Sequence, residues 1–261
     1  MATTITQLTN RIPMSYKFLP LLFLGFLAFK PAVKAVKTTN NVNDSVKIIE
    51  NNRLLAENKE INFEVLSKNV FNSINKGAYS LPSLESFTKA FEGYEQLKKL
   101  GKVKNEVLTI IDFSLSSTKE RMWVIDMTTQ RVILQSLVSH GMNSGTEYAK
   151  SFSNENNSHK SSLGFYLTGE TYNGKHGLSM KLDGQEFGVN HNARERAVVV
   201  HGAEYVNKNL IKTQGYIGRS QGCPAVPTHL TKKLIDITKN KSVLYIHHPS
   251  RIYMNKSSLT S

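Results

Sequence analysis

Between residues 61 and 104, apolar residues recur at the spacing of amphipathic helices. A first set falls three or four residues apart and ends at Gly77. A second set begins near Pro82, which a first helical turn tolerates, and ends with two lysines before Gly101. The two apolar stripes are Phe63, Leu66, Val70 and Ile74, and then Leu84, Phe87, Phe91, Tyr94 and Leu97. The pattern predicts a short α-helical hairpin over residues 61–104 that packs on a core.

After Lys104 the apolar residues follow the spacing of strands. Val107–Phe113 is apolar on both faces, as in a central strand. Arg121–Asp126 and Arg131–Val138 flank four turn-forming residues and predict a β-hairpin. We also predict strands at Leu163–Thr168, Ala197–Val200 and Val243–His247, a turn at Thr171–Lys175 and a helix at Leu230–Thr238. Helices followed mostly by strands predict an α+β fold with an antiparallel or mixed sheet, with the β-rich domain over residues 105–249.

Three stretches lack a clear apolar period. Residues 36–60 are rich in Asn, Lys, Glu and Thr and predict a polar linker, although a few aliphatic residues occur there. Residues 139–162 predict a long loop, and residues 250–261 predict a polar tail.

The first 35 residues are organised like an export signal. Phe18–Phe29 is a twelve-residue apolar core, preceded by a region with Arg11 and Lys17. A membrane span needs about 20 apolar residues, so this length fits a secretory signal. Val33 and Ala35 supply small residues before a cleavage site. Residues 1–35 therefore predict a signal peptide, or a signal anchor if uncleaved, and export to the periplasm or cell envelope. Only this segment is expected to contact a membrane.

The formal net charge is +13, from 33 basic and 20 acidic residues. Four basic residues and no acidic ones lie in the first 35, which leaves +9 for the remainder. Such an excess favours a polyanionic partner. The basic residues are dispersed and form no recognisable nucleic-acid-binding module. A basic surface that faces an acidic extracytoplasmic environment is therefore preferred to nucleic-acid binding.

The candidate nucleophile is Cys223, the only cysteine in the chain. Exported proteins usually use cysteine in disulfides, but a single cysteine cannot form one within the chain. A buried structural cysteine is the alternative, but the neighbours Ser220, Gln221, Gly222 and Pro224 are not typical of an apolar core segment. His201 lies twenty-two residues upstream, at the end of an apolar run. This arrangement predicts a Cys/His nucleophilic site.

These residue types suggest acyl transfer. A thiol reacts as a thiolate, so Cys223 needs a base, and His201 is the best candidate. Gly222 allows a tight turn in which successive backbone N–H groups point to one spot, as in an oxyanion hole. The predicted reaction is attack on an amide or ester carbonyl, formation of a thioester, and transfer to an amine or to water.

Zinc binding is the main alternative role for the histidines. Zinc sites favour closely spaced ligand pairs. His176, His191, His201 and His229 lie 15, 10 and 28 residues apart, with no acidic partner arranged around them. The adjacent His247 and His248 project to opposite sides of a predicted strand. We therefore expect no metal site.

Three segments carry a resemblance to the murein L,D-transpeptidase catalytic domain family, the cysteine enzymes of peptidoglycan cross-linking. They are His201–Ala203, Gly218–Pro227 and Lys160–Gly169, and the resemblance extends over about Phe63 to Pro249. The family has Ser or Thr three residues before the nucleophile and Gly directly before it, and Ser220 and Gly222 match. The resemblance implies a β-rich catalytic fold with Cys223 as nucleophile, His201 as base and the Gly202 carbonyl orienting His201.

The sequence departs from the common family pattern at two positions. Gln221 stands where the family usually has His, and Ala225 where it has Asn or Arg. Both fit a distinct subfamily that reads G-R-S-x-G-C-P-A. They leave open which residues bind the donor's carboxylates. Arg219 is the first candidate, followed by Arg194 and Arg196; Gln221 and Tyr166, in the segment that resembles the family's cleft lining, are further substrate-binding candidates.

The resemblance also implies the substrate. The acyl donor would be a peptidoglycan stem tetrapeptide, and the acceptor the side-chain amine of another stem, a lipoprotein lysine, a free D-amino acid or water. Carbapenems would acylate Cys223, and no metal or organic cofactor is implied. An L,D-carboxypeptidase or endopeptidase on the same scaffold remains open, as does a non-catalytic peptidoglycan-binding module. A sortase-like enzyme is disfavoured because it would have Thr-Cys in place of Gly222-Cys223.

Overall fold

A computed structural model describes residues 49, 52–53 and 62–260 of the chain. The predicted signal segment, residues 1–35, and most of the predicted linker lie outside the described residues. Where the chain is described, no helix is both long enough and apolar enough to span a bilayer.

Two helices precede the sheet, as predicted. Residues 62–73 are helical, and α2 (Leu84–Lys99) begins after Ser83, whose Oγ accepts a hydrogen bond from the Ser86 N–H. The Phe91 ring stacks on those of Phe63 and Phe87, each with centroids 5.7 Å apart, and so joins the two helices. Most of the predicted apolar stripes face inward, whereas Leu66 and Leu84 are exposed.

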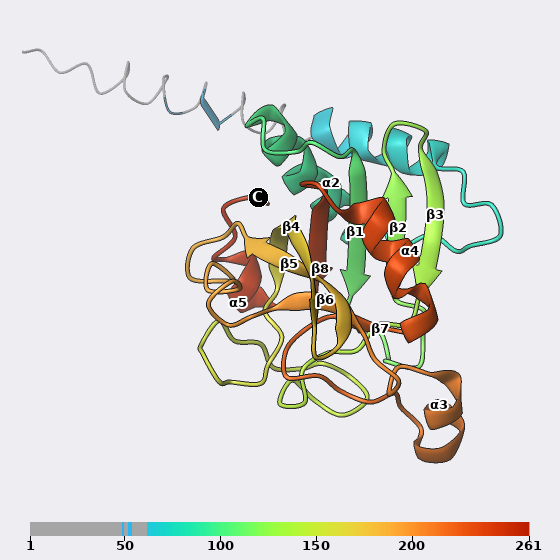
Figure 1. The fold of residues 1–261 in the computed structure, drawn as a ribbon. Helices are drawn as coiled ribbons and strands as arrows, with labels where there is room; N and C mark the ends of the chain where they lie inside the picture. The colour runs from blue at the N-terminus through green and yellow to red at the C-terminus, as the bar shows by residue number, and fades with distance from the viewer. Residues whose placement is uncertain (1–48, 50–51, 54–61, 261) are drawn as a thin grey trace, which may run out of the picture. The chain divides into compact units, whose positions relative to one another are not determined.

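The described strands form one mixed sheet of eight (Figure 1). The strands are β1 (Val107–Asp112), β2 (Met122–Asp126), β3 (Arg131–Ser136), β4 (Gly164–Gly174), β5 (Gly177–Gly184), β6 (Val199–Gly202), β7 (Ala225–Val226) and β8 (Val243–His247). Their order is β3-β2-β1-β8-β4-β5-β6-β7. The β1–β8 and β6–β7 pairs are parallel and the others antiparallel. Ser139, which follows β3, donates its N–H to the Ala225 carbonyl of β7 at 2.8 Å, so the sheet nearly closes on itself.

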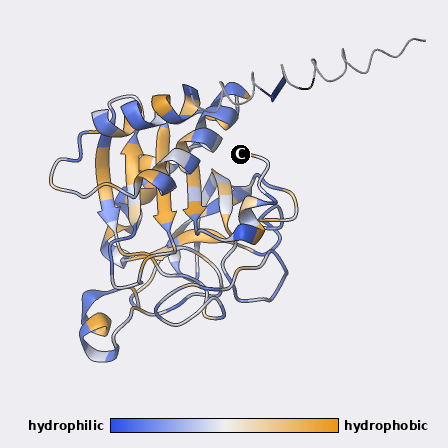
Figure 2. Ribbon diagram, turned by 180° about the vertical axis from the view of Figure 1, so that it is seen from behind, coloured by the Kyte–Doolittle hydropathy of each residue, from blue (hydrophilic) through white to orange (hydrophobic). Residues whose placement is uncertain are grey.

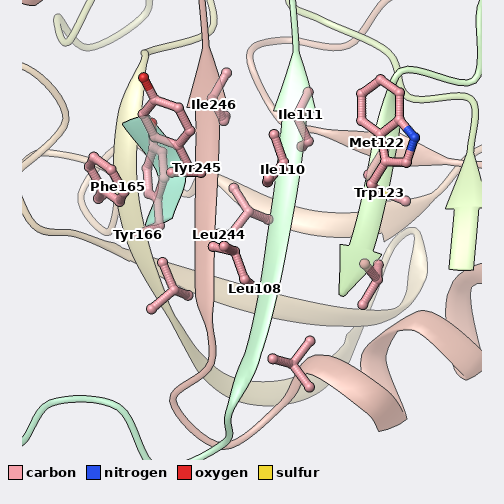
Figure 3. Close-up of a cluster of buried hydrophobic side chains, with 14 of the residues drawn as sticks. Leu108, Ile110, Ile111, Met122, Trp123, Phe165, Tyr166, Leu244, Tyr245 and Ile246 are labelled. Atoms are coloured by element: carbon pink, nitrogen blue, oxygen red, sulfur yellow. The ribbon is translucent and has the colours of Figure 1, made fainter. Parts of the chain in front are cut away.

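The centre of the sheet is buried on both faces because helices cover both. Helix α2 covers one face and α4 (Thr228–Thr238) the other (Figure 1). Every residue of β1 and β8 is buried. Apolar residues concentrate on these strands (Figure 2), and their side chains interdigitate with those of β2 and β4 (Figure 3). Burial of each such Leu or Ile stabilises the fold by about 1.5–3 kcal/mol.

The predicted turn at Thr171–Lys175 was wrong. β4 continues through Gly174, and only Lys175 and His176 form the turn to β5, a strand that the apolar pattern did not reveal. The second half of β4 is exposed, from Glu170 to Gly174, so it has no buried face to produce an alternating pattern.

Two short helices and β7 were also not predicted. Helix α3 (Lys208–Gln214) contains no buried residue, and α5 (Arg251–Met254) lies in the predicted polar tail. The tail is partly anchored, because the Ser257 Oγ donates to the buried carboxylate of Glu186 at 2.5 Å and the Tyr253 hydroxyl donates to it at 3.3 Å.

Candidate active site

Strand pairing explains how His201 and Cys223 come together. His201 lies near the end of β6, opposite Ser179 of β5 on one side and Ala225 of β7 on the other. Because Cys223 stands two residues before Ala225, the parallel β6–β7 pairing brings it level with Val199, two residues before His201 on β6. Both residues line one cavity of about 660 Å³.

The turn that carries Cys223 is shaped by Ser220. The Ser220 Oγ accepts a hydrogen bond from the Gly222 N–H at 3.0 Å and donates one to the Cys223 carbonyl at 2.6 Å. Gly222 has a φ of +124°, which favours glycine, and an added Cβ would lie 2.8 Å from the Lys160 carbonyl oxygen. The glycine is therefore required by both conformation and space. Because its N–H is bonded to Ser220, an oxyanion hole has to use other donors, such as the N–H of Cys223.

The turn at Cys223 is hydrogen-bonded to His140, whose buried side chain pairs with that of Arg121. The Ser220 N–H donates to the His140 carbonyl at 2.9 Å. The fully buried His140 ring has its Nδ1 2.7 Å from Nη2 of Arg121 and its Nε2 3.2 Å from the Gly145 carbonyl oxygen. Since the guanidinium can only donate, Nδ1 accepts and the neutral ring carries its proton on Nε2. Burial, followed by the charge of Arg121, lowers the pKa of His140 to about 4.

The geometry of His201 favours a neutral base. Its Nδ1 lies 2.9 Å from the carbonyl oxygen of Gly202, the contact that the family resemblance implied. A carbonyl only accepts, so Nδ1 carries the proton and Nε2 keeps a lone pair. Burial lowers the pKa of His201, which keeps the ring neutral at pH 7. Such a ring is able to take a proton from a thiol.

Cys223 is held as a thiol when the site is at rest. Burial raises the pKa of its Sγ, while the Val199 N–H and the charges of Arg196 and Lys175 oppose this effect. The Val199 N–H donates to Sγ at 3.4 Å, and the thiol points to the Ala197 carbonyl at 3.6 Å. Because its pKa is raised, Cys223 requires a base to become nucleophilic.

Arg196 is a half-buried cation beside this thiol. Its Nη1 donates to the Ser153 carbonyl at 2.8 Å and to the Ser162 Oγ at 3.1 Å, and its Nη2 to the Lys160 carbonyl at 2.6 Å. These partners are uncharged, so they hold the guanidinium in place without cancelling its charge. The field of Arg196 is therefore available to a thiolate at Cys223 or to an anionic substrate.

Most of the predicted site residues meet at this cavity. Its lining includes His201, Arg196, Arg219, Ser220, Gln221 and Cys223. Further residues line the cavity that the sequence did not indicate as part of the site: Lys175, Met142, Asn157, Tyr172, Tyr205 and His176. His159 lines it too; from its place in a polar loop we expect a solvated side chain, with substrate contact as the alternative. None of its lining residues is Asp or Glu. The cavity is thus suited to an anionic ligand.

Two predicted substrate-binding residues lie elsewhere. Tyr166 is 0% exposed and packs in the core (Figure 3), where its hydroxyl donates to the Ser162 carbonyl at 3.0 Å. Arg194 pairs with Glu170 and Asp183 on an exposed part of β4 and β5. Neither lines the cavity, so Tyr166 cannot contact a substrate there, and the charge of Arg194 is already compensated.

Among the described residues, no group of three or more His, Cys, Asp or Glu side chains is arranged to hold a metal ion. Of the six histidines discussed as possible ligands in the sequence, His176 and His201 stack on each other, whereas the His191 ring contacts Phe187.

Residues 80–247, more than half of the chain, match the L,D-transpeptidase catalytic domain family (YkuD_2). No curated protein matches the sequence.

Several solved structures are similar. An L,D-transpeptidase from Mycobacterium smegmatis is 14% identical with a TM-score of 0.34, over 55% of this chain and 59% of that one. A mutant of the helical cell shape determining protein Pgp2 from Campylobacter jejuni is 12% identical with a TM-score of 0.37, over 66% and 58%. An L,D-transpeptidase from Xylanimonas cellulosilytica is 13% identical with a TM-score of 0.33, over 71% and 93%. The chain thus spans less than two thirds of the length of the first two. On the match of residues 80–247, the chain belongs to the L,D-transpeptidase catalytic domain family.

Proposed function

We propose that this protein is an exported peptidoglycan L,D-transpeptidase of the G-R-S-x-G-C-P-A type, in which Cys223 is acylated by a stem tetrapeptide. The observation that carries the proposal is the cavity itself. It combines a thiol, a neutral imidazole with its lone pair on Nε2, and a lining without a carboxylate. Family membership supplies the substrate class, because the family acts on peptidoglycan.

In the proposed acylation step, Nε2 of His201 takes the thiol proton as Sγ attacks the carbonyl carbon of the scissile amide. The oxygen becomes an oxyanion, which the N–H of Cys223 can bind. When this intermediate collapses, the C–N bond breaks and the imidazolium gives its proton to the leaving amine. The donor's carbonyl carbon is now held as a thioester on Sγ.

Transfer is the reverse sequence with a new nucleophile. An acceptor amine gives a proton to His201 and attacks the thioester; the amide forms, and Sγ leaves and is reprotonated. Water in place of the amine would give the carboxypeptidase or endopeptidase reaction. Both routes use the same residues, so hydrolysis remains the second candidate activity.

The neighbouring residues have separate roles in this scheme. Ser220 shapes the turn, Gly202 orients His201, and Gly222 allows the approach of Lys160. Arg196 stabilises negative charge near Sγ. Arg219 and Gln221 remain substrate-binding candidates at the cavity.

The first test is intact-protein mass spectrometry after incubation with a carbapenem. The wild type should gain one adduct, and Cys223→Ser should gain none. Cys223→Ala should fold and lose turnover, and His201→Ala should acylate several orders of magnitude more slowly. Arg194→Ala is the matched control and should acylate like the wild type, because Arg194 lies outside the cavity. A folded wild type with a free reduced thiol and no adduct would favour the binding-module alternative.

Muropeptide assays would then separate the two activities. Purified enzyme is incubated with a disaccharide tetrapeptide, with and without an amine acceptor. A cross-linked or exchanged product indicates transfer, whereas a tripeptide alone indicates hydrolysis. If neither product forms with an enzyme that the carbapenem acylates, the stem tetrapeptide is the wrong donor.

A further inference from the structure

The turn between β4 and β5 forms one wall of the catalytic cavity. Gly174 and Gly177 are the last paired residues of the two strands, so Lys175 and His176 alone make the connection. The next residues of β5 pair with β6, with Ser179 opposite His201. This register brings the turn beside the candidate base. The His176 and His201 rings stack with centroids 4.4 Å apart and planes at 23°.

Lys175 is the cation of this cavity that has no hydrogen-bond or ion-pair partner among the described residues. The three Lys and Arg residues in the lining are Lys175, Arg196 and Arg219. Arg196 donates to carbonyl and hydroxyl oxygens, and Arg219 donates Nη1 to the carbonyls of Met142 and Gly145. In contrast, no described residue forms a hydrogen bond or an ion pair with the Lys175 ammonium. Its charge is nevertheless felt at the site, because it is among the groups that lower the pKa values of His201 and Cys223.

The two sides of the cavity carry cations with different neighbours. Arg196 lies on the side of the thiol, where its Nη2 is 3.5 Å from the position of a Cβ on Gly222. Lys175 directly precedes His176, whose ring stacks on that of His201. In the proposed reaction, His201 must protonate the leaving amine, so the leaving group has to lie on the His201 side. In an amino-acid leaving group, the α-carboxylate is separated from that amine by one carbon atom.

We propose that Lys175 binds the free α-carboxylate of the leaving amino acid and thereby selects donors whose terminal residue is a free acid. This inference rests on the proposed function and adds a specificity-determining residue to it. A lysine ammonium and a carboxylate form a charge-assisted hydrogen bond, and the absence of a competing carboxylate in the lining leaves the ammonium available. An amide or an extended chain at this position would leave the ammonium unpaired.

A purely electrostatic role is the alternative. Lys175 would then act only through the pKa values of His201 and Cys223, and its loss would slow every donor to the same extent. The two roles differ in whether the effect depends on the charge of the leaving group.

The test compares two tetrapeptide donors that differ only in a terminal carboxylate or a terminal amide. kcat/KM is measured for the full chain with both donors, for wild type, Lys175→Ala, Lys175→Arg and Lys212→Ala. Lys212 lies on α3, exposed and outside the cavity lining, and serves as a matched control. We expect the wild type and Lys212→Ala to prefer the acid by about tenfold or more.

Lys175→Ala should reduce this preference to within about twofold, mainly by raising KM for the acid, and should leave the amide nearly unchanged. Lys175→Arg should restore it. A Lys175→Ala variant that keeps the acid preference, or loses rate equally with both donors, overturns the inference while the proposed function stands. A wild type that is acylated by neither donor nor by a carbapenem overturns both.

Discussion

His140 should make the stability of this domain depend on pH. Its ring is fully buried, accepts a hydrogen bond from Arg121 and lies near Arg219. Phe113 packs against it edge-on, with ring centroids 5.9 Å apart. Protonation would place two cations in direct contact and remove the acceptor at Nδ1. Burial and Arg121 therefore lower the pKa of His140 to about 4 from an ordinary 6.5.

The sign of the effect follows from this lowered pKa. Above pH 6.5 the ring is neutral in both the folded and the unfolded chain, and its full contribution to stability is present. As the pH falls below 6.5, the unfolded chain binds a proton and the folded chain does not, so the free energy of unfolding decreases. At about 1.4 kcal/mol per pH unit, the interval from 6.5 to about 4 corresponds to a loss of roughly 3 kcal/mol. This is a large part of the 5–15 kcal/mol typical of a domain.

Urea unfolding between pH 7 and pH 4.5 measures this loss, with His140→Gln as the comparison. The Gln side chain can accept from Arg121 through its oxygen and donate to the Gly145 carbonyl, and it does not titrate. His201, His247 and His248 also have lowered pKa values and contribute to the slope of both proteins. The variant should therefore lose less stability than the wild type, by about 2–3 kcal/mol at pH 4.5. Parallel curves for the two proteins would refute the reasoning.

Two further substitutions test the turn at Cys223 and the anchored tail. Gly222→Ala should slow carbapenem acylation at least about tenfold, because its methyl group meets the Lys160 carbonyl at a φ of +124°. Gly215→Ala, which has a φ of +84° but no atom within 4 Å, is the control and should acylate normally. Ser257→Ala should lower the free energy of unfolding at pH 7 by about 1–3 kcal/mol, because it removes a donor to buried Glu186. Ser258 is an exposed neighbour, and Ser258→Ala should leave the free energy of unfolding unchanged. If urea unfolding shows that both variants lose the same free energy of unfolding, the contact with Glu186 does not have this role.

The strongest apolar patterns predicted their elements well. Val107–Phe113, apolar on both faces, became β1 at the centre of the sheet, and Arg121–Asp126 with Arg131–Val138 became the β2–β3 hairpin. Because these segments are buried, their apolar residues follow the spacing of the strands that they form. The exposed end of β4 and helix α3 have little or no buried surface, and the pattern could not reveal them.

The sequence also did not predict which side chains are buried in the core or already paired. Tyr166 and Arg194 looked like substrate ligands because an aromatic residue in a cleft-like motif and an arginine are common in binding sites. In the structure Tyr166 faces Ser162 inside the core, and Arg194 is paired with Glu170, which lies twenty-four residues before it. Which face of β4 is buried, and which carboxylate meets an arginine, depends on the sheet order, and no local pattern encodes that order.

The resting Cys223–His201 pair is uncharged for a physical reason that the sequence could not supply. Burial raises the pKa of Cys223 and lowers that of His201, so both shifts favour the thiol and imidazole over the ion pair. In the proposed reaction, the thiolate and the imidazolium then form only as the substrate is attacked. The cations of Arg196 and Lys175 favour the thiolate that forms, and the Lys175 charge also disfavours protonation of His201, which opposes the ion pair. A carboxylate bound to Lys175 would screen that charge, which makes His201 a stronger base but also removes the support that Lys175 gives to the thiolate. These two effects oppose each other, so Arg196 is the cation that favours the thiolate whether or not a carboxylate is bound.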